Sequence, residues 1–249
     1  MTIARRILDE RLQEVAELIC DPALDIGGEK KFARGTFERP NQQMFCLNIA
    51  SRYSPDVVGS CYSLPFAEGS FSTVLMCEIL EHLENPELAL DEAFRVLRID
   101  GMLVMSVPFL YRHHRNPADY QRWTHEKIWD ELVNKRGWVV EVFLPRGAWL
   151  ATVLDMLTQG LTAVVPRTFA GSSLLSFFGK QVARSISLTY PFWVKIDRYL
   201  SNEERTKSIF HRYTTGYLVA ARKKPKRPDG SKPITAPDFL RFPQTRRSD

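Results

Sequence analysis

Two short, nearly continuous apolar runs constrain the fold of this chain more than any other feature of its sequence. They cover residues 71–77 and 102–107, and the helical spacing of Leu90, Phe94 and Leu97 lies between them. A strand that is apolar at every position must be covered on both faces, which is typical of a parallel sheet flanked by helices. The order strand, helix, strand therefore predicts an α/β domain.

Further patterns extend this motif to a seven-stranded, mostly parallel sheet with helices on both faces. We expect strands near residues 23–26, 44–49, 56–59, 72–77, 102–107, 138–144 and 214–221. Amphipathic helices are predicted over residues 2–19, after a capping residue at Asn85, and from a cap at Thr124 to Gly137. Asn85 precedes a proline at the first helical position, and Asp100-Gly101 is expected to stop that helix.

Residues 147–212 differ from the rest of the chain because they are apolar in patches and show no strand alternation. They predict a helical cap inserted before the last strand. The expected organisation is therefore an α/β domain of residues 1–146 and 213–221, a cap of residues 147–212 and a tail of residues 222–249. Three surroundings stay open for the cap: packing on the domain, a lipid-facing lid, or contact with a membrane interface.

The net charge of +5 and the isoelectric point near 9.0 come from the C-terminal end of the chain. Residues 222–249 hold nine basic and three acidic residues, a net charge of +6, so residues 1–221 carry about −1. Five of the fifteen prolines lie in the same segment, which predicts a basic, disordered tail. Because the body is nearly neutral, we expect no stable complex with nucleic acid, although the tail offers phosphate contacts.

The cysteines and the apolar segments favour a cytoplasmic protein. Cys20, Cys46, Cys61 and Cys77 form no CxxC pair, and we expect them to be reduced. The N-terminal residues carry charges throughout, unlike a signal peptide, and no uncharged apolar run reaches the ~18 residues of a membrane-spanning helix. Peripheral contact at the inner membrane face, through the cap and the basic tail, is a further expectation.

The turn after the first predicted strand carries two adjacent glycines, Gly27 and Gly28. Glycine has no Cβ, so a ligand can approach the backbone there. A dinucleotide fingerprint would also need glycines at positions 29 and 32, where Glu29 and Phe32 stand, so a nicotinamide dehydrogenase is disfavoured. In open α/β sheets ligands bind beyond the carboxyl ends of the strands, which makes this turn a candidate binding site.

Four segments occur in order along the chain: LDIGGEK at 24–30, SLPFAEGSFSTVLMCEILEHLENPELAL at 63–90, RVLRIDGMLVMSVPF at 95–109 and HRNPADYQRWT at 114–124. Together they resemble the class I S-adenosylmethionine-dependent methyltransferases, and more narrowly a bacterial small-molecule subset of that family. The resemblance covers about residues 20–145. It implies a Rossmann-like fold, an enzyme with S-adenosylmethionine as cofactor, and O-methylation of a small-molecule or glycan/lipid-linked acceptor.

The resemblance also implies which residues line the cofactor pocket: Asp25, Gly27, Gly28, Asn48, Ser60, Cys61, Cys77 and His82. The family's next glycine corresponds either to Gly28, in a loop shorter by one residue, or to Glu29. Asn48 replaces the family's ribose-binding acid, and a neutral amide binds less strongly by ~1 kcal/mol. Ser60 replaces the aspartate that meets the adenine. These departures leave open an alternative function as a non-catalytic binding or scaffold protein with a degenerate cofactor site.

The segment after the fifth strand is expected to bind the acceptor. A hydroxyl acceptor needs a base, and histidine suits neutral pH. The family's pattern in this segment is matched by His114, Asp119, Tyr120, Arg122 and Trp123. We expect His114 to be the catalytic base, and the substrate-binding residues to be Tyr111, His113, Asp119, Tyr120, Arg122 and Trp123.

Structural roles stay open beside these functional ones. Asp119 and Arg122 would form a local ion pair, Trp123 would pack under the next helix, and His82 would hold its loop. No metal is expected at His82, His113 and His114, because the sequence implies no acidic partner near them.

Overall fold

The computed structural model describes residues 2–29, 43–115, 117–164, 173–202 and 212–225, together with residue 235. The chain divides into two compact units. The first, which we call the sheet unit, comprises Asp9–Phe109, His113–Leu144 and Tyr217–Asp249. The second, which we call the cap unit, comprises Met1–Leu8, Leu110–Arg112 and Pro145–Gly216.

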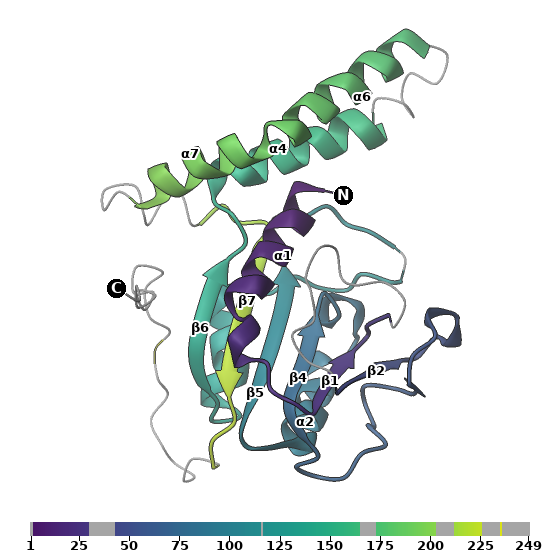
Figure 1. Ribbon diagram of the computed structural model, residues 1–249, viewed down its shortest axis with the longest axis vertical. Helices are drawn as coiled ribbons and strands as arrows, with labels where there is room; N and C mark the ends of the chain where they lie inside the picture. The colour runs from purple at the N-terminus through teal and green to yellow at the C-terminus, as the bar shows by residue number, and fades with distance from the viewer. Residues whose placement is uncertain are drawn as a thin grey trace. The chain divides into compact units, whose positions relative to one another are not determined.

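The described residues form one sheet of seven strands in the order β3-β2-β1-β4-β5-β7-β6 (Figure 1). The strands are β1 Ala23–Ile26, β2 Met44–Asn48, β3 Val57–Val58, β4 Phe71–Cys77, β5 Leu97–Pro108, β6 Val139–Pro145 and β7 Gly216–Arg222. The pairs β1–β2, β1–β4, β2–β3 and β4–β5 are parallel, and β7 runs opposite to its neighbours. This order and direction confirm the predicted mostly parallel, Rossmann-like α/β fold.

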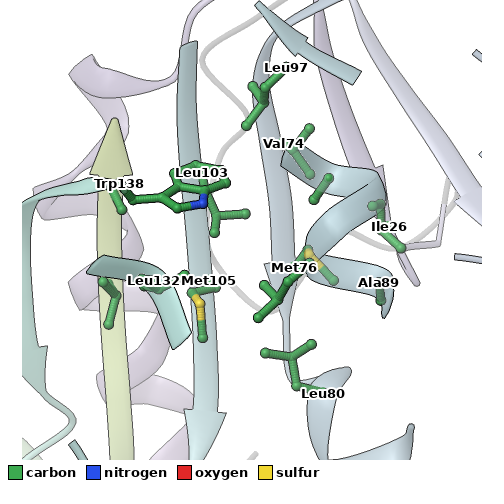
Figure 2. Packing of buried hydrophobic residues seen from close by; sticks show 14 of the residues in the cluster. Ile26, Val74, Met76, Leu80, Ala89, Leu97, Leu103, Met105, Leu132 and Trp138 are labelled. Carbon is green, nitrogen blue, oxygen red and sulfur yellow. The ribbon is translucent and has the colours of Figure 1, made fainter. Parts of the chain in front are cut away.

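The two apolar runs of the sequence lie at the centre of this sheet. Every residue of β4 is buried, and so is β5 from residue 101 to its end. Figure 2 shows Val74 and Met76 of β4 and Leu103 and Met105 of β5 packed among residues from other elements, Trp138 included. Burial at successive positions requires cover on both faces, as the unbroken apolar pattern predicted.

Short helices connect the strands: α1 Ile3–Glu14, η1 Ala16–Leu18, η2 Ser51–Tyr53, η3 Leu80–His82, α2 Pro86–Val96, α3 His125–Trp129 and the π-helical turn η4 Asp130–Asn134. Thr124 caps α3 as predicted, since its Oγ1 accepts a hydrogen bond from Lys127 N at 3.3 Å. Pro86 opens α2, but Asn85 makes no capping bond with its side chain, so its predicted capping role is wrong.

The predicted end of α2 at Asp100-Gly101 is also wrong. The helix ends at Val96, and the chain passes directly into β5. Phe71 pairs with Leu97 whereas Thr73 pairs with Met102, so the extra residues bulge out of the ladder. Gly101 permits this bulge, because a Cβ there would lie 2.8 Å from the carbonyl oxygen of Arg98.

The predicted tail begins too early at residue 222. Arg222 ends β7, and the buried ammonium group of Lys223 donates to the carbonyl oxygens of Phe94 at 2.7 Å and Leu97 at 2.6 Å. These carbonyls close the last turn of α2, where a cation is favourable. Beyond residue 225 the tail, residue 235 apart, lies outside the described residues.

The cap unit is helical in its described part, as the sequence predicted. It contains α4 Trp149–Gln159, the π-helical turn η5 Gly160–Val164, α6 Ser173–Leu188 and α7 Tyr190–Asn202 (Figure 1). Helix α4 packs against both α6 and α7. Ile3 and Ile7 of α1 join Ala151 and Tyr190 in the apolar centre of this unit, a contribution that the sequence did not predict.

Candidate active site

The glycine turn after β1 is shaped by close packing. Gly27 has a φ of +77°, and its N–H donates to the carbonyl oxygen of Leu47 at 2.8 Å. A Cβ on Gly28 would lie 2.1 Å from Oδ2 of Asp25, whose carboxylate is buried beneath the turn. Both positions therefore require glycine, and the backbone of the turn is left without side-chain cover.

Asn48, at the end of β2, ties the glycine turn to the neighbouring strand. Its Nδ2 donates to the carbonyl oxygen of Gly28 at 3.0 Å, and its Oδ1 accepts from Ala50 N at 3.0 Å. An aspartate has no donor for the bond to Gly28. This bond is a structural reason for an amide at this position, where the family that the sequence resembles has an acid.

Ser60 and Cys61 follow β3 at the same edge of the sheet. Oγ of Ser60 accepts from Tyr62 N at 3.2 Å, which closes a tight local turn. Burial raises the pKa of the Cys61 thiol to about 11, so this group is neutral at physiological pH. Cys77 is buried at the end of β4. Because β1 to β4 are parallel neighbours, the residues at their carboxyl ends gather at the edge where an α/β sheet binds ligands.

The loop after β4 carries His82, and residues 120 and 121 hold it by hydrogen bonds. Gln121 donates to the carbonyl oxygens of Leu80 at 3.3 Å and Leu83 at 2.8 Å, and accepts from Nε1 of Trp123 at 2.8 Å. Tyr120 N donates to the carbonyl oxygen of Glu81 at 2.8 Å. Sequence reasoning missed Gln121, since its role depends on contacts across more than thirty residues of chain.

A buried carboxylate orients His114. Oδ2 of Asp119 accepts from the backbone N of His114 at 2.9 Å and lies 3.0 Å from Nδ1 of the same residue. The guanidinium of Arg122 binds both oxygens of Asp119, with Nη2 at 2.7 Å from Oδ2. Hydrogen bonding to Arg122 holds the pKa of Asp119 well below its usual range, although burial opposes the shift. Asp119 is therefore an anion, and its contact with Nδ1 of His114 is an ion pair when the imidazole is protonated, without the direction of a hydrogen bond.

His82 lies against His114. The two rings meet edge to face with centroids 4.9 Å apart. Nδ1 of His82 is 2.7 Å from the carbonyl oxygen of Ala118, which can only accept, so Nδ1 is the protonated nitrogen. Nε2 lies 3.6 Å from Oε1 of the buried Glu81.

Glu81, His82 and His114 offer ligand atoms that all lie within 4.8 Å of one another, so this group could hold a metal ion. The sequence implied no acidic partner for the histidines, and Glu81 is that partner. Its signal was its place beside His82, but burial of the carboxylate is a property of the fold. His113 is exposed and does not belong to the group.

The remaining predicted substrate residues fall into three environments. Trp123 is buried with the ring under Lys127 Nζ, 5.3 Å from its centroid, which favours a packing role. Tyr120 is exposed, and its hydroxyl donates to Oε1 of Glu84 at 3.0 Å. Tyr111 belongs to the cap unit, and its contact with substrate stays a prediction.

In a comparison with known proteins, a family model matches part of this chain. The model of a family described as a methyltransferase domain matches residues 31–105. No curated protein matches the sequence.

Several solved structures share the fold. Geranyl diphosphate C-methyltransferase from Streptomyces coelicolor A3(2), in complex with Mg²⁺, geranyl diphosphate and S-adenosyl-L-homocysteine, has a TM-score of 0.52 and 11% identity over 88% of this chain and 77% of that chain. A SAM-dependent methyltransferase from Archaeoglobus fulgidus has a TM-score of 0.51 and 15% identity, covering 88% and 94%. The cyclase SpnF has a TM-score of 0.51 and 12% identity, covering 87% and 80%. At these identities the likeness establishes the fold alone.

Proposed function

We propose that this chain, which carries a class I S-adenosylmethionine-dependent methyltransferase domain, methylates a hydroxyl group of a small-molecule or glycan/lipid-linked acceptor. The observation that carries the proposal is the histidine of the acceptor segment, His114, held by a buried and ionised Asp119. A hydroxyl oxygen must lose its proton as it is methylated, and such a pair is suited to receive it.

The residues at the carboxyl ends of β1 and β2 fit the cofactor. S-adenosylmethionine supplies a methyl group on a positively charged sulfur. Gly27 and Gly28 leave the turn open to its methionine part, and the bond from Asn48 to Gly28 keeps that turn in place. The carbonyl Oδ1 of Asn48 retains a second lone pair beside its bond to Ala50, which is available to a ribose hydroxyl.

His114 acts as the general base in this mechanism. Nδ1 lies beside the anionic Asp119, and we assign Nε2 as the nitrogen that receives the proton of the acceptor. With S-adenosylmethionine bound, Nε2 of His114 would receive the hydroxyl proton of the acceptor as its oxygen is methylated. The anionic Asp119 then stabilises the imidazolium, and a positioned base of this kind contributes about 10²–10⁴-fold to the rate.

Arg122 is a positioning residue in this account. Its guanidinium binds Asp119 through two nitrogens, which fixes the carboxylate and keeps it charged. His82 is held at Nδ1 by Ala118 and packs on the His114 ring, so it restricts the orientation of the base. The family's role for His82 at the cofactor stays compatible with this placement.

The test is methyl transfer from tritium-labelled S-adenosylmethionine to separated fractions of the source cells. We expect label in the glycan or lipid-linked glycan fraction, and an O-methyl sugar or alcohol after hydrolysis. Label confined to RNA or protein would contradict the acceptor class. Calorimetry with S-adenosylhomocysteine is the control: a chain that does not bind it at millimolar concentration is the non-catalytic scaffold and not an enzyme.

A further inference from the structure

Helix α4 of the cap unit buries mainly polar side chains and exposes apolar ones. Its buried residues are Ala151, Thr152, Asp155 and Thr158, three of them polar. Its exposed residues are apolar: Trp149, Val153, Met156 and Leu157. These four positions recur at i, i+4, i+7 and i+8, so they form one stripe along the helix. A helix of a water-surrounded domain normally turns such a stripe inward.

The buried polar groups explain how α4 is held in this orientation. Oδ1 of Asp155 accepts from Ala4 N at 2.9 Å, and Oγ1 of Thr152 donates to the carbonyl oxygen of Tyr213 at 3.0 Å. Asp197 accepts from the N–H groups of Ala148 and Leu150, at 2.8 and 2.9 Å, at the start of the helix. Long-range hydrogen bonds therefore fix the polar face inward and leave the apolar stripe outside.

Helices α6 and α7 expose aromatic and aliphatic side chains as well. In α6, Phe177 and Leu188 are separated by eleven residues, or three turns, and share one face with Arg184. In α7, Phe192 and Tyr199 share a face with Lys195, which lies between them. Leu188 is 71% exposed and Tyr199 is 68% exposed.

The exposed charge of these helices has one sign. Among side chains that the structure describes on α4, α6 and α7, the exposed charged ones are Lys180, Arg184 and Lys195. The two acids on these helices, Asp155 and Asp197, are buried and hydrogen-bonded to backbone N–H groups. No helix that the structure describes is long and apolar enough to cross a membrane.

We infer that the outer surface of α4, α6 and α7 docks on an anionic lipid bilayer. Aromatic and aliphatic side chains with interspersed lysine and arginine are the composition of helices that lie in the headgroup region. The basic side chains are drawn to anionic lipid, and tryptophan and tyrosine favour the membrane–water interface. The inference goes beyond the proposed function, because it does not depend on which hydroxyl is methylated.

A membrane suits these observations better than a protein partner. The apolar side chains are spread along three helices, whereas a protein hot spot gathers aromatic residues in a compact patch. A second copy of the chain would bring the same basic side chains against one another, and like charges at an interface are costly. A surface of anionic lipid satisfies both the apolar and the basic groups.

Flotation of the full chain with lipid vesicles tests the inference. We expect binding to vesicles of phosphatidylcholine mixed with phosphatidylglycerol, weaker binding at high salt, and little binding to phosphatidylcholine alone. Replacing Lys180, Arg184 and Lys195 together by alanine should weaken binding about 100-fold, since each cation near the surface contributes about 1 kcal/mol. A triple variant Trp149→Ser, Leu157→Ser and Leu188→Ser should abolish flotation.

The matched control is Leu88→Ser with Ile99→Ser, which removes two side chains of the sheet unit that are 52% and 51% exposed. This variant should float like the unchanged chain. Far-ultraviolet circular dichroism of each variant shows that it is folded. Brominated lipid gives a second readout in the full chain: it should quench fluorescence that Trp149→Phe removes.

Three outcomes overturn the inference. They are equal binding to neutral and anionic vesicles, an equal loss in the control variant, and a chain that sediments as a dimer which the apolar substitutions dissociate. The last outcome assigns the surface to a second copy. Each of these outcomes leaves methyl transfer intact. Failure of the membrane-docking inference is therefore distinguishable from failure of the proposed function.

Discussion

Helices α2 and α4 are both eleven residues long, and they bury opposite kinds of side chain. Helix α2 buries Pro86, Ala89, Leu90, Ala93 and Val96, all apolar. Helix α4 buries threonines and an aspartate and exposes its apolar stripe. The hydrophobic effect therefore places α2 on the sheet, whereas α4 is held by buried hydrogen bonds together with a small apolar contact at Ala151. The difference indicates that the cap unit was not shaped for water alone.

Buried carboxylates show the same contrast between the two units. In the sheet unit, burial pushes the pKa of Glu131 up, but ion pairs with Lys127, Lys135 and Arg136 outweigh it and bring the pKa down to about 2. In the cap unit, burial raises the pKa of Asp155, since hydrogen bonds from Ala4 and Gln159 compensate only in part. The sheet unit compensates its buried acid with three cations in contact, whereas the cap unit uses mainly neutral donors and a weaker attraction to the charge of Arg146.

The largest expected difference in the free energy of unfolding is between two leucine-to-alanine variants, one on each helix. Leu90→Ala opens a cavity in the core of the sheet unit and should lower the free energy of unfolding by about 2–5 kcal/mol. Leu157→Ala removes a side chain that is 48% exposed and should change it by less than about 0.5 kcal/mol. Urea unfolding of both variants measures this. Equal losses would show that α4 is packed like α2.

A smaller change in the free energy of unfolding is expected when the pH is lowered. The lowered pKa of Glu131 means that its contribution is present above the usual glutamate range and is lost as the pH falls toward about 2. That loss amounts to about 3 kcal/mol. The raised pKa of Asp155 has the opposite sign: its contribution favours folding at low pH and is lost as the pH rises through the folded value.

The pair Glu131→Gln and Asp155→Asn separates these contributions. In urea unfolding at a series of pH values, Glu131→Gln should flatten the loss of stability in acid, and Asp155→Asn should steepen it. The two variants would show the same pH dependence if the carboxylates were equivalent.

The sheet could be predicted from local patterns, because each of its central elements is recognisable from the pattern of consecutive residues. Continuous burial of β4, the cap at Thr124 and the proline that opens α2 are properties of short segments. What the sequence did not predict depends on residues far apart in the chain. The bulge in β5 and the bonds of Lys223 to the end of α2 arise only when β7 and β4 are in place.

The site divides in the same way. His114 and Asp119 are five residues apart, and the sequence placed both in one segment without predicting that they pair. The clamp by Gln121 and the acidic partner Glu81 join loops that follow different strands. The apolar patches of residues 147–212 predicted a helical cap but could not predict which face of α4 points outward, because Asp155 bonds to Ala4, which lies 151 residues away in the chain.

The central claim is that His114, held by Asp119, is the base of a methyl transfer, and the most direct test replaces the imidazole by an amide. His114→Gln should lower the rate of methyl transfer by about 10²–10⁴-fold while its affinity for S-adenosylhomocysteine stays within about twofold. The control is His125→Gln, which changes a histidine of α3 paired with Glu126 and should leave the rate unchanged. A His114→Gln variant that transfers methyl groups at the original rate would contradict the account.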